Sequence, residues 1–323
     1  MKITKRILTT LLLMTLLFCM SLSVSAAKPK LNKSKATVLC GKSVKLTANQ
    51  KVTWTSSNES IATVKNGKVT GKDYGTVNIT AINKKGEKRT CKVTVSKYTV
   101  KSTGNRKYPT QVTVHISGKT YKTYKNYSQT GFSSAYINQR GCSHSALCTA
   151  LSAYGKSYTP LDTHNGSVKV KASERYALKK LGKTPKVTGQ SMSVYSISHM
   201  MKNAGVKCHP VYKFTKTGAI KEITDNLNAG RPVLIMCHRK KVNGVKLANS
   251  YHFIVLVGID QNGYAIVLNP AGGTVNRSHC TGNFKLTVKQ LVKNHMWSCT
   301  GNGYKNFYFN GSKNYGGYIV VDK

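Results

Sequence analysis

The sequence predicts two domains of different fold classes, an all-β sandwich followed by an α+β domain, behind an N-terminal export signal. Short alternating segments rich in Val, Thr and Ile fill residues 31–95, as in small antiparallel sandwiches. From about residue 126, a helical pattern is followed by long apolar strands. The chain of 323 residues is also longer than one average domain.

The first residues have the order of a secretory signal peptide. Cations precede an apolar run from residue 7 to about residue 20, and small residues follow before Ala27. The run is shorter than the roughly 18 to 20 residues that a membrane-spanning helix needs. We therefore expect a signal peptide over residues 1–27, no transmembrane span, and a protein that is secreted, extracellular or associated with the cell wall.

The chain is strongly basic, with 51 Lys and Arg against 9 Asp and Glu and a formal net charge of +42. The lysines are spread through patterned sequence, which indicates either a uniformly solvated basic surface or attraction to a polyanion. For an exported protein, such a partner is an anionic cell-wall polymer such as teichoic acid. No zinc-finger spacing, aromatic RNA-binding signature or basic helix occurs, so we do not expect nucleic acid as a partner.

The first domain is predicted over residues 28–97, and its turns and strands carry a specific resemblance. The matching strings are GKSVKL from Gly41, VTWTSSN from Val52, IATV from Ile61 and GKVTG from Gly67. They resemble the bacterial Ig-like domain, group 2, which implies an immunoglobulin-like sandwich and association with the cell surface. The domain contains no histidine and few acids, so we expect it to bind or to act as a spacer.

Two of the nine cysteines, Cys40 and Cys91, fall in this domain. Because exported proteins fold where disulfides persist, we predict a Cys40–Cys91 disulfide, with two free thiols as the alternative. Residues 98–125 are rich in Lys, Tyr and Thr and are expected to form a connector. Part of this stretch alternates like a hairpin, so the first strands of the second domain are the alternative.

The second domain is predicted over residues 126–323 and contains a cysteine at the start of a helix. Good helix formers run from Ser145, and Gly155 supplies a stop. Cys142 therefore lies at the helix N-terminus, where unpaired N–H groups stabilise a thiolate and lower its pKa. Gln139, three residues earlier, can present its amide to a developing oxyanion.

Two strands farther along the chain carry a candidate base and its orienting group. His252 begins an apolar strand, and an Asn-Gly turn at residues 261–263 leads to a second strand that ends at Asn269 and Pro270. A tight Asn-Gly turn predicts an antiparallel hairpin. Pairing about this turn brings His252 and Asn269 to the same end of the hairpin.

These residues carry a second resemblance. The strings Gln139-x-x-Cys142, Gly230-Arg-Pro, His252-Phe and Asn269-Pro270 are similar to papain-like peptidases, in particular to the bacteriocin-leader-processing cysteine peptidase family 39 and its secreted relatives. The resemblance implies an α+β papain-like fold that needs no cofactor or metal. It also implies four roles: Cys142 is the nucleophile, His252 the general base and acid, Asn269 the orienter of the imidazole, and Gln139 an oxyanion-hole donor.

The sequence departs from the family pattern at two positions, Ser143 and Asn269, where the family commonly has Gly and Asp. An amide can still orient an imidazole, as in Cys-His-Asn sites. We therefore expect a monomeric, secreted or wall-associated cysteine peptidase that cleaves a peptide or protein substrate. The alternatives are an amidase or transpeptidase of wall peptides and a non-catalytic wall-binding adhesin.

Other His and Cys residues indicate less. His144 is expected at the surface or at the rim of a cleft, because it faces away from the nucleophile on the first helical turn. His279, Cys280, His295 and Cys299 have no compact zinc-ligand spacing. For Cys280 and Cys299, a disulfide or buried thiols is the expectation.

Overall fold

A computed structural model describes residues 27–118, 120–168, 194–212, 214–238, 240–249, 252–278, 280–296 and 317–322. It divides into two compact units, one with residues up to 37 and 43–94, the other with residues 38–42 and 95–323. The predicted signal peptide, apart from its last residue, lies outside the described residues. Within the described part of the chain, no helix has the length and apolar character needed to cross a membrane.

The first unit is built of strands, as expected for an immunoglobulin-like sandwich. One sheet has the order β1-β7-β6-β3, formed by Lys35–Leu39, Lys88–Ser96, Gly75–Ile82 and Thr53–Ser56. The other has the order β2-β5-β4, formed by Ser43–Lys45, Lys68–Gly71 and Ala62–Lys65. Alternate residues of β6, among them Val77, Ile79 and Ala81, are buried, because successive side chains of a strand point to opposite faces.

The predicted disulfide between Cys40 and Cys91 is wrong: both side chains are buried and no disulfide joins them. The register of β7 gives the reason. The N–H of Cys40 donates to the carbonyl of Ser96, at the end of β7, with a distance of 3.1 Å. Cys91 lies five residues earlier on that strand, and a strand rises about 3.3 Å per residue, which gives roughly 16 Å. A disulfide needs Cα atoms within about 7 Å.

Residues 98–125, expected as a connector, form most of a three-stranded antiparallel sheet that belongs to the second unit. Its order is β10-β9-β8, from Thr120–Asn126, Thr110–Ser117 and Tyr98–Ser102. Val112, Val114 and Tyr124 of this sheet are buried in a core shared with the helix that begins at Cys142. The stretch therefore agrees with the alternative, in which it supplies the first strands of the second domain.

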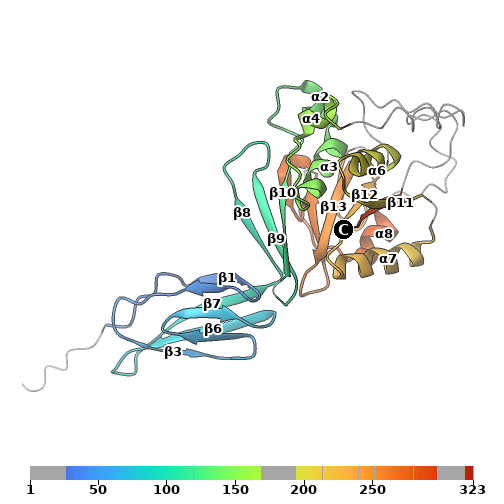
Figure 1. The fold of residues 1–323 in the computed structure, drawn as a ribbon. Coiled ribbons are helices and arrows are strands. Elements are labelled where there is room, and N and C mark those ends of the chain that lie inside the picture. The colour runs from blue at the N-terminus through green and yellow to red at the C-terminus, as the bar shows by residue number, and fades with distance from the viewer. Residues whose placement is uncertain are drawn as a thin grey trace, which may run out of the picture. The chain divides into compact units, whose positions relative to one another are not determined.

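A six-stranded sheet forms the centre of the second unit (Figure 1). Its order is β11-β18-β12-β13-β14-β15, from Cys208–Val211, Tyr318–Val321, Val233–Cys237, His252–Ile259, Ala265–Asn269 and Thr274–Val275. The pairs along this sheet are antiparallel. The predicted hairpin is confirmed, since β13 pairs with β14 in the register Val255 to Leu268.

Helices cover both faces of this sheet, so the second unit is a mixed α/β structure. Helices α3 (Cys142–Ser152) and α6 (Val194–Asn203) pack on one face, and α7 (Lys216–Asn228) and α8 (Val288–Asn294) pack on the other (Figure 1). Every residue of β12 and β14 is buried as a result, which explains why these strands read as continuous apolar runs.

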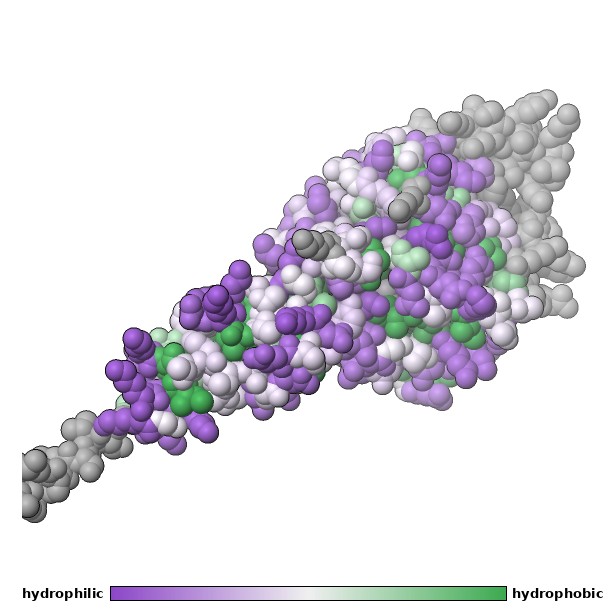
Figure 2. Space-filling model, turned by 60° about the horizontal axis from the view of Figure 1, so that its bottom comes forward, coloured by the Kyte–Doolittle hydropathy of each residue, from purple (hydrophilic) through white to green (hydrophobic). Residues whose placement is uncertain are grey.

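Polar and charged side chains cover much of the face shown in Figure 2, with apolar residues scattered among them. Among the described residues, Val100 is the only large hydrophobic side chain that is clearly exposed, with 46% of its surface accessible. The chain is therefore strongly basic and still has a well-formed hydrophobic core. The basic composition does not mark a chain too polar to fold.

Gly230 is a position where an added methyl group should be costly. Its φ is +71°, and a Cβ there would lie 2.2 Å from Ile116 Cδ1. Gly263 has a similar φ of +82° with no atom within 4 Å of an added Cβ. We expect Gly230→Ala to lower the free energy of unfolding by about 1 to 3 kcal/mol more than Gly263→Ala, because only Gly230→Ala adds overpacking to the backbone strain. Urea unfolding followed by circular dichroism measures the difference, and equal losses would show that Ile116 moves aside freely.

Candidate active site

A tight junction between two consecutive helices places Cys142 at the first position of α3. Helix α2 (Ala135–Arg140) begins at Ser134, whose hydroxyl accepts from the N–H of Ile137, and it ends at Gly141. A Cβ on Gly141 would lie 2.5 Å from the carbonyl oxygen of Ile137, so only glycine fits this junction. The chain can therefore start a new helix at once, with Cys142 as its first residue.

Cys142 is a half-buried residue, and its thiol lies among backbone N–H donors. Burial raises the pKa of the Cys142 thiol above its ordinary value, while the N–H groups of Phe253, Ser143 and Cys142 itself act in the opposite direction. The Phe253 N–H also places the sulfur near the start of β13, where His252 is the residue before Phe253. The N–H groups at the helix start thus act in the expected direction, but desolvation outweighs them, so the pKa is raised overall.

His252 and Asn269 meet at the predicted end of the hairpin. His252 Nε2 lies 2.7 Å from Asn269 Oδ1, and both side chains are buried, with 4% and 0% of their surfaces accessible. Asn269 Oδ1 also accepts from the N–H of Ala271 at 2.9 Å, and Asn269 Nδ2 donates to the carbonyl of Arg277 at 2.9 Å. These partners therefore identify which end of the Asn269 amide is the oxygen and which is the nitrogen.

This assignment fixes the tautomer of His252. Since Asn269 Oδ1 is an acceptor, His252 Nε2 must carry the proton and donate it, and the lone pair of the neutral ring is at Nδ1. Burial lowers the pKa of His252 below its ordinary value, and the hydrogen bond to Asn269 only partly offsets the shift. The ring is thus neutral at neutral pH and can act as a base.

Cys237 carries a second thiol next to His252. Cys237 is directly opposite His252 in the register of β12 and β13, and it is fully buried. Burial raises the pKa of Cys237 far above its ordinary range, and charge on Cys142 raises it further. Cys237 is therefore an inert core residue, whereas Cys142 is only half-buried as a residue.

Two glutamines that precede Cys142 in the chain have different surroundings. Gln139, the predicted oxyanion-hole donor, is in the last turn of α2 with an exposed side chain. Gln129, which sequence reasoning missed, donates its N–H to Pro270 at 2.8 Å, and its Oε1 is buried with no hydrogen-bond partner among the described residues. The closer spacing of Gln139 to Cys142 favoured it in the sequence. Only the pairing with Pro270 reveals Gln129.

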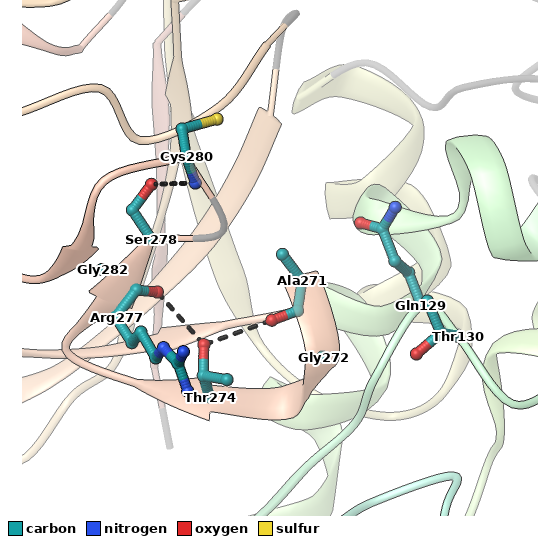
Figure 3. Close-up of a pocket in the computed structure, with 9 residues that line it drawn as sticks. All are labelled: Gln129, Thr130, Ala271, Gly272, Thr274, Arg277, Ser278, Cys280 and Gly282. Atoms are coloured by element: carbon teal, nitrogen blue, oxygen red, sulfur yellow. Dashed lines mark hydrogen bonds between the residues drawn. The ribbon is translucent and has the colours of Figure 1, made fainter.

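A cavity of about 490 Å³ lies between Gln129 and the loop that follows Asn269. Its lining residues are Gln129, Thr130, Ala271, Gly272, Thr274, Arg277, Ser278, Cys280 and Gly282. Figure 3 shows Gln129 on one wall and Arg277 on the opposite wall, with Cys280 at one end. The cavity thus adjoins the residue that orients His252.

His144 is buried, with 2% of its surface accessible, so its expected place at a surface or cleft rim is wrong. Its Nδ1 lies 2.9 Å from Thr163 Oγ1, on helix α4 (Pro160–His164). Thr163 Oγ1 gives its proton to the carbonyl of Pro160, so His144 Nδ1 is the donor. Burial, with a smaller contribution from His164, lowers the pKa of His144 to about 3. His144 therefore packs α3 against α4 as a neutral ring.

Among the described residues, no cluster of three or more His, Cys, Asp or Glu side chains could hold a metal ion. Cys280 donates to Asn249 Oδ1, with a sulfur to oxygen distance of 3.3 Å. His279 and Cys299 lie outside the described residues, and so does the suggested pairing of Cys280 with Cys299.

A thiol at a helix start, a neutral imidazole and a buried orienting amide are the residue types of a cysteine peptidase. The family model of the Peptidase_C39 like family matches residues 121–295, more than half of the chain, and the chain belongs to this family. The model of the bacterial Ig-like domain (group 2) matches residues 20–95. No curated protein matches the chain. Family membership thus points to a cysteine peptidase with a peptide or protein substrate.

The low pKa of His144 predicts a specific loss of stability in acid. A histidine titrates near 6.5 when unfolded and near 3 in this fold, so between these values the unfolded chain binds the extra proton. The contribution of neutral His144 to the free energy of unfolding is complete above pH 6.5 and should fall by about 2 kcal/mol between pH 7 and pH 5. His144→Gln should remove this part of the pH dependence, measured by denaturant unfolding at both pH values.

His209→Gln is a control of opposite sign. Burial lowers the pKa of His209, but hydrogen bonds and charges from Glu222 and Asp322 raise it, and the net shift is upward. His209 therefore adds stability as pH falls. His209→Gln should therefore steepen the loss in acid. An unchanged slope in His144→Gln would mean that the ring is not held neutral.

Proposed function

We propose that the protein is a secreted or wall-associated cysteine peptidase of papain-like fold that hydrolyses peptide bonds with Cys142, His252 and Asn269. The observation that carries the proposal is the 2.7 Å contact between His252 Nε2 and Asn269 Oδ1, which puts the lone pair of the ring on Nδ1, the nitrogen that the proposal assigns to the Cys142 thiol. The position of Cys142 among the N–H groups at the start of α3 and β13 supports the same assignment.

In this proposal the resting pair is a neutral thiol and a neutral imidazole, since burial raises one pKa and lowers the other. As Cys142 Sγ attacks the scissile carbonyl carbon, the thiol proton passes to His252 Nδ1. The imidazolium then gives this proton to the leaving amine, and the carbon to nitrogen bond breaks to give a thioester. His252 next takes a proton from water, whose oxygen attacks the thioester carbon. The carbon to sulfur bond then breaks, the proton passes from His252 to Cys142 Sγ, and the acid is released.

The negative oxygen of the tetrahedral intermediate needs donors. The N–H of Cys142, at the first position of α3, is one candidate, and a glutamine amide supplies the second. Gln139 stays the candidate from the sequence. Gln129 is a second candidate because it lines the cavity next to the Asn269 loop. Separate alanine variants of the two glutamines decide between them.

Export and wall association are part of the proposal. The N-terminal signal-like sequence, the bacterial Ig-like domain and the net charge of +42 support a location near anionic wall polymers such as teichoic acid. Binding of this kind weakens as salt rises, because mobile ions screen exposed charges. We propose that the protein acts there as a monomer.

The bacterial Ig-like domain and the high positive charge favour a second candidate, an amidase or transpeptidase that uses the same chemistry on wall peptides. Release of peptides from purified sacculi, lost in Cys142→Ala, would distinguish it from a peptidase of proteins. A non-catalytic adhesin would bind the wall equally well with and without the Cys142 thiol.

The proposal predicts graded losses in a thiol-directed activity probe and in peptide hydrolysis. Cys142→Ala should abolish both. His252→Ala should lower kcat/KM by at least about 1000-fold, and Asn269→Ala by about 10- to 100-fold, because the base is lost in the first and only its orientation in the second. Of Gln129→Ala and Gln139→Ala, the true oxyanion donor should lower kcat by about 100-fold and spare probe labelling. Labelling that survives Cys142→Ala would refute the assignment.

A neutral resting thiol also predicts how Cys142 reacts with iodoacetamide. Because the pKa of Cys142 is raised and only the thiolate reacts, the alkylation rate should increase about tenfold per pH unit between pH 6 and pH 8. Mass spectrometry of the peptide that contains Cys142 measures this rate, with Cys142→Ala as the control for its identity. A rate independent of pH over this range would instead indicate a preformed thiolate and imidazolium pair.

A further inference from the structure

We propose that the cavity between Gln129 and Arg277 is a substrate subsite that receives a carboxylate, carried by the part of the substrate that leaves as the amine. The inference rests on the proposed peptidase function and extends it to the chemistry of the substrate. It follows from where the cavity lies, which groups line it and how firmly its walls are held.

Both walls of the cavity are tied to the proposed catalytic residues. On one side, Asn269 holds the two ends of the loop from Ala271 to Arg277 through its side-chain oxygen and nitrogen. On the other side, the segment before Gln129 is held by helix α3, since Ser145 Oγ donates to the carbonyl of Ser128 at 3.1 Å. The Gln129 N–H joins the two walls through Pro270. The cavity is therefore part of the surroundings of the site and not a remote hollow.

The position of Asn269 indicates which part of the substrate reaches this cavity. His252 must hand its proton to the leaving amine, so the leaving segment lies on the His252 side of the sulfur. Asn269 is hydrogen-bonded to the far nitrogen of His252, and the cavity begins at the loop that follows Asn269. The residues just beyond the scissile bond are thus the nearest to it.

The lining selects for negative charge. Arg277 is the only charged residue among the nine that line the cavity, and none of the nine is acidic. A guanidinium binds a carboxylate through two parallel hydrogen bonds, a pairing stronger than one between neutral groups. On the opposite wall, Gln129 carries no charge.

The backbone that carries Arg277 is held by hydrogen bonds and close packing. Asn276 has a φ of +48°, its N–H donates to Val267, and its side chain accepts from the N–H of the same residue at 2.8 Å. Gly273 has a φ of +61°, and an added Cβ would lie 2.5 Å from Pro109 Cγ. The described hydrogen bonds of Arg277 use its backbone carbonyl, and its side chain is exposed. Substitutions of this side chain should therefore leave the fold intact.

The test is cleavage of a proteome-derived peptide library by the full chain, read by mass spectrometry. We expect Asp, Glu or the peptide C-terminus to be enriched in the one to three positions after the cut. Arg277→Gln should reduce this preference about 10- to 100-fold, and Arg277→Glu should replace it with a preference for Lys. Arg89→Gln, an exposed arginine of the first unit, makes the same charge change and should have no effect. A preference that is absent, or that survives Arg277→Gln, would overturn the proposal.

A binding measurement separates this inference from the proposed function. Saturation-transfer NMR with Cys142→Ala protein compares acetyl-Glu-amide, acetyl-alanine and acetyl-Gln-amide. The first two carry a side-chain and a terminal carboxylate, and the third is their neutral control. Carboxylate binding that Arg277→Gln abolishes would uphold the subsite even if no peptide were cleaved. The ligand that binds more strongly would show whether the subsite prefers a side-chain or a terminal carboxylate. Equal binding of all three would reject the subsite whatever the activity.

Discussion

The hydrogen bonds of Asn269 are the interaction on which the site depends. A buried amide is costly unless its oxygen and nitrogen both find partners, and here the oxygen meets His252 and Ala271 while the nitrogen meets Arg277. One side chain thereby fixes the imidazole tautomer, the start of the following loop and its end. The imidazole, the loop and the cavity wall are consequently held as a unit.

The central sheet makes this arrangement possible. Because helices cover both of its faces, β13 and β14 are apolar along their length, and polar side chains are tolerated only where the strands end. His252 and Asn269 occupy such ends, one opening a strand and the other closing its neighbour. Helix α3 packs against the same strands and brings its first residue to that edge.

The sequence was informative wherever the signal was local. The start of α3 at Cys142 and the hairpin that pairs His252 with Asn269 depend on helix formers, apolar runs and an Asn-Gly turn within short stretches. Features set by distant contacts were missed. The register of β7 separates Cys40 from Cys91, α4 buries His144, and only the hydrogen bond to Pro270 brings Gln129 to the cavity. No neighbouring residue in the sequence encodes these contacts.

In the proposed peptidase, the neutral state of the thiol and imidazole has a consequence for the chemical survival of Cys142. Peroxide and similar oxidants attack a thiolate much faster than a thiol, and the sulfinic and sulfonic acids that follow are irreversible in most proteins. A sulfur that keeps its proton until a carbonyl carbon is in reach is exposed to this damage only briefly. Burial of the Cys142 thiol thus lowers its intrinsic reactivity and also slows its oxidation.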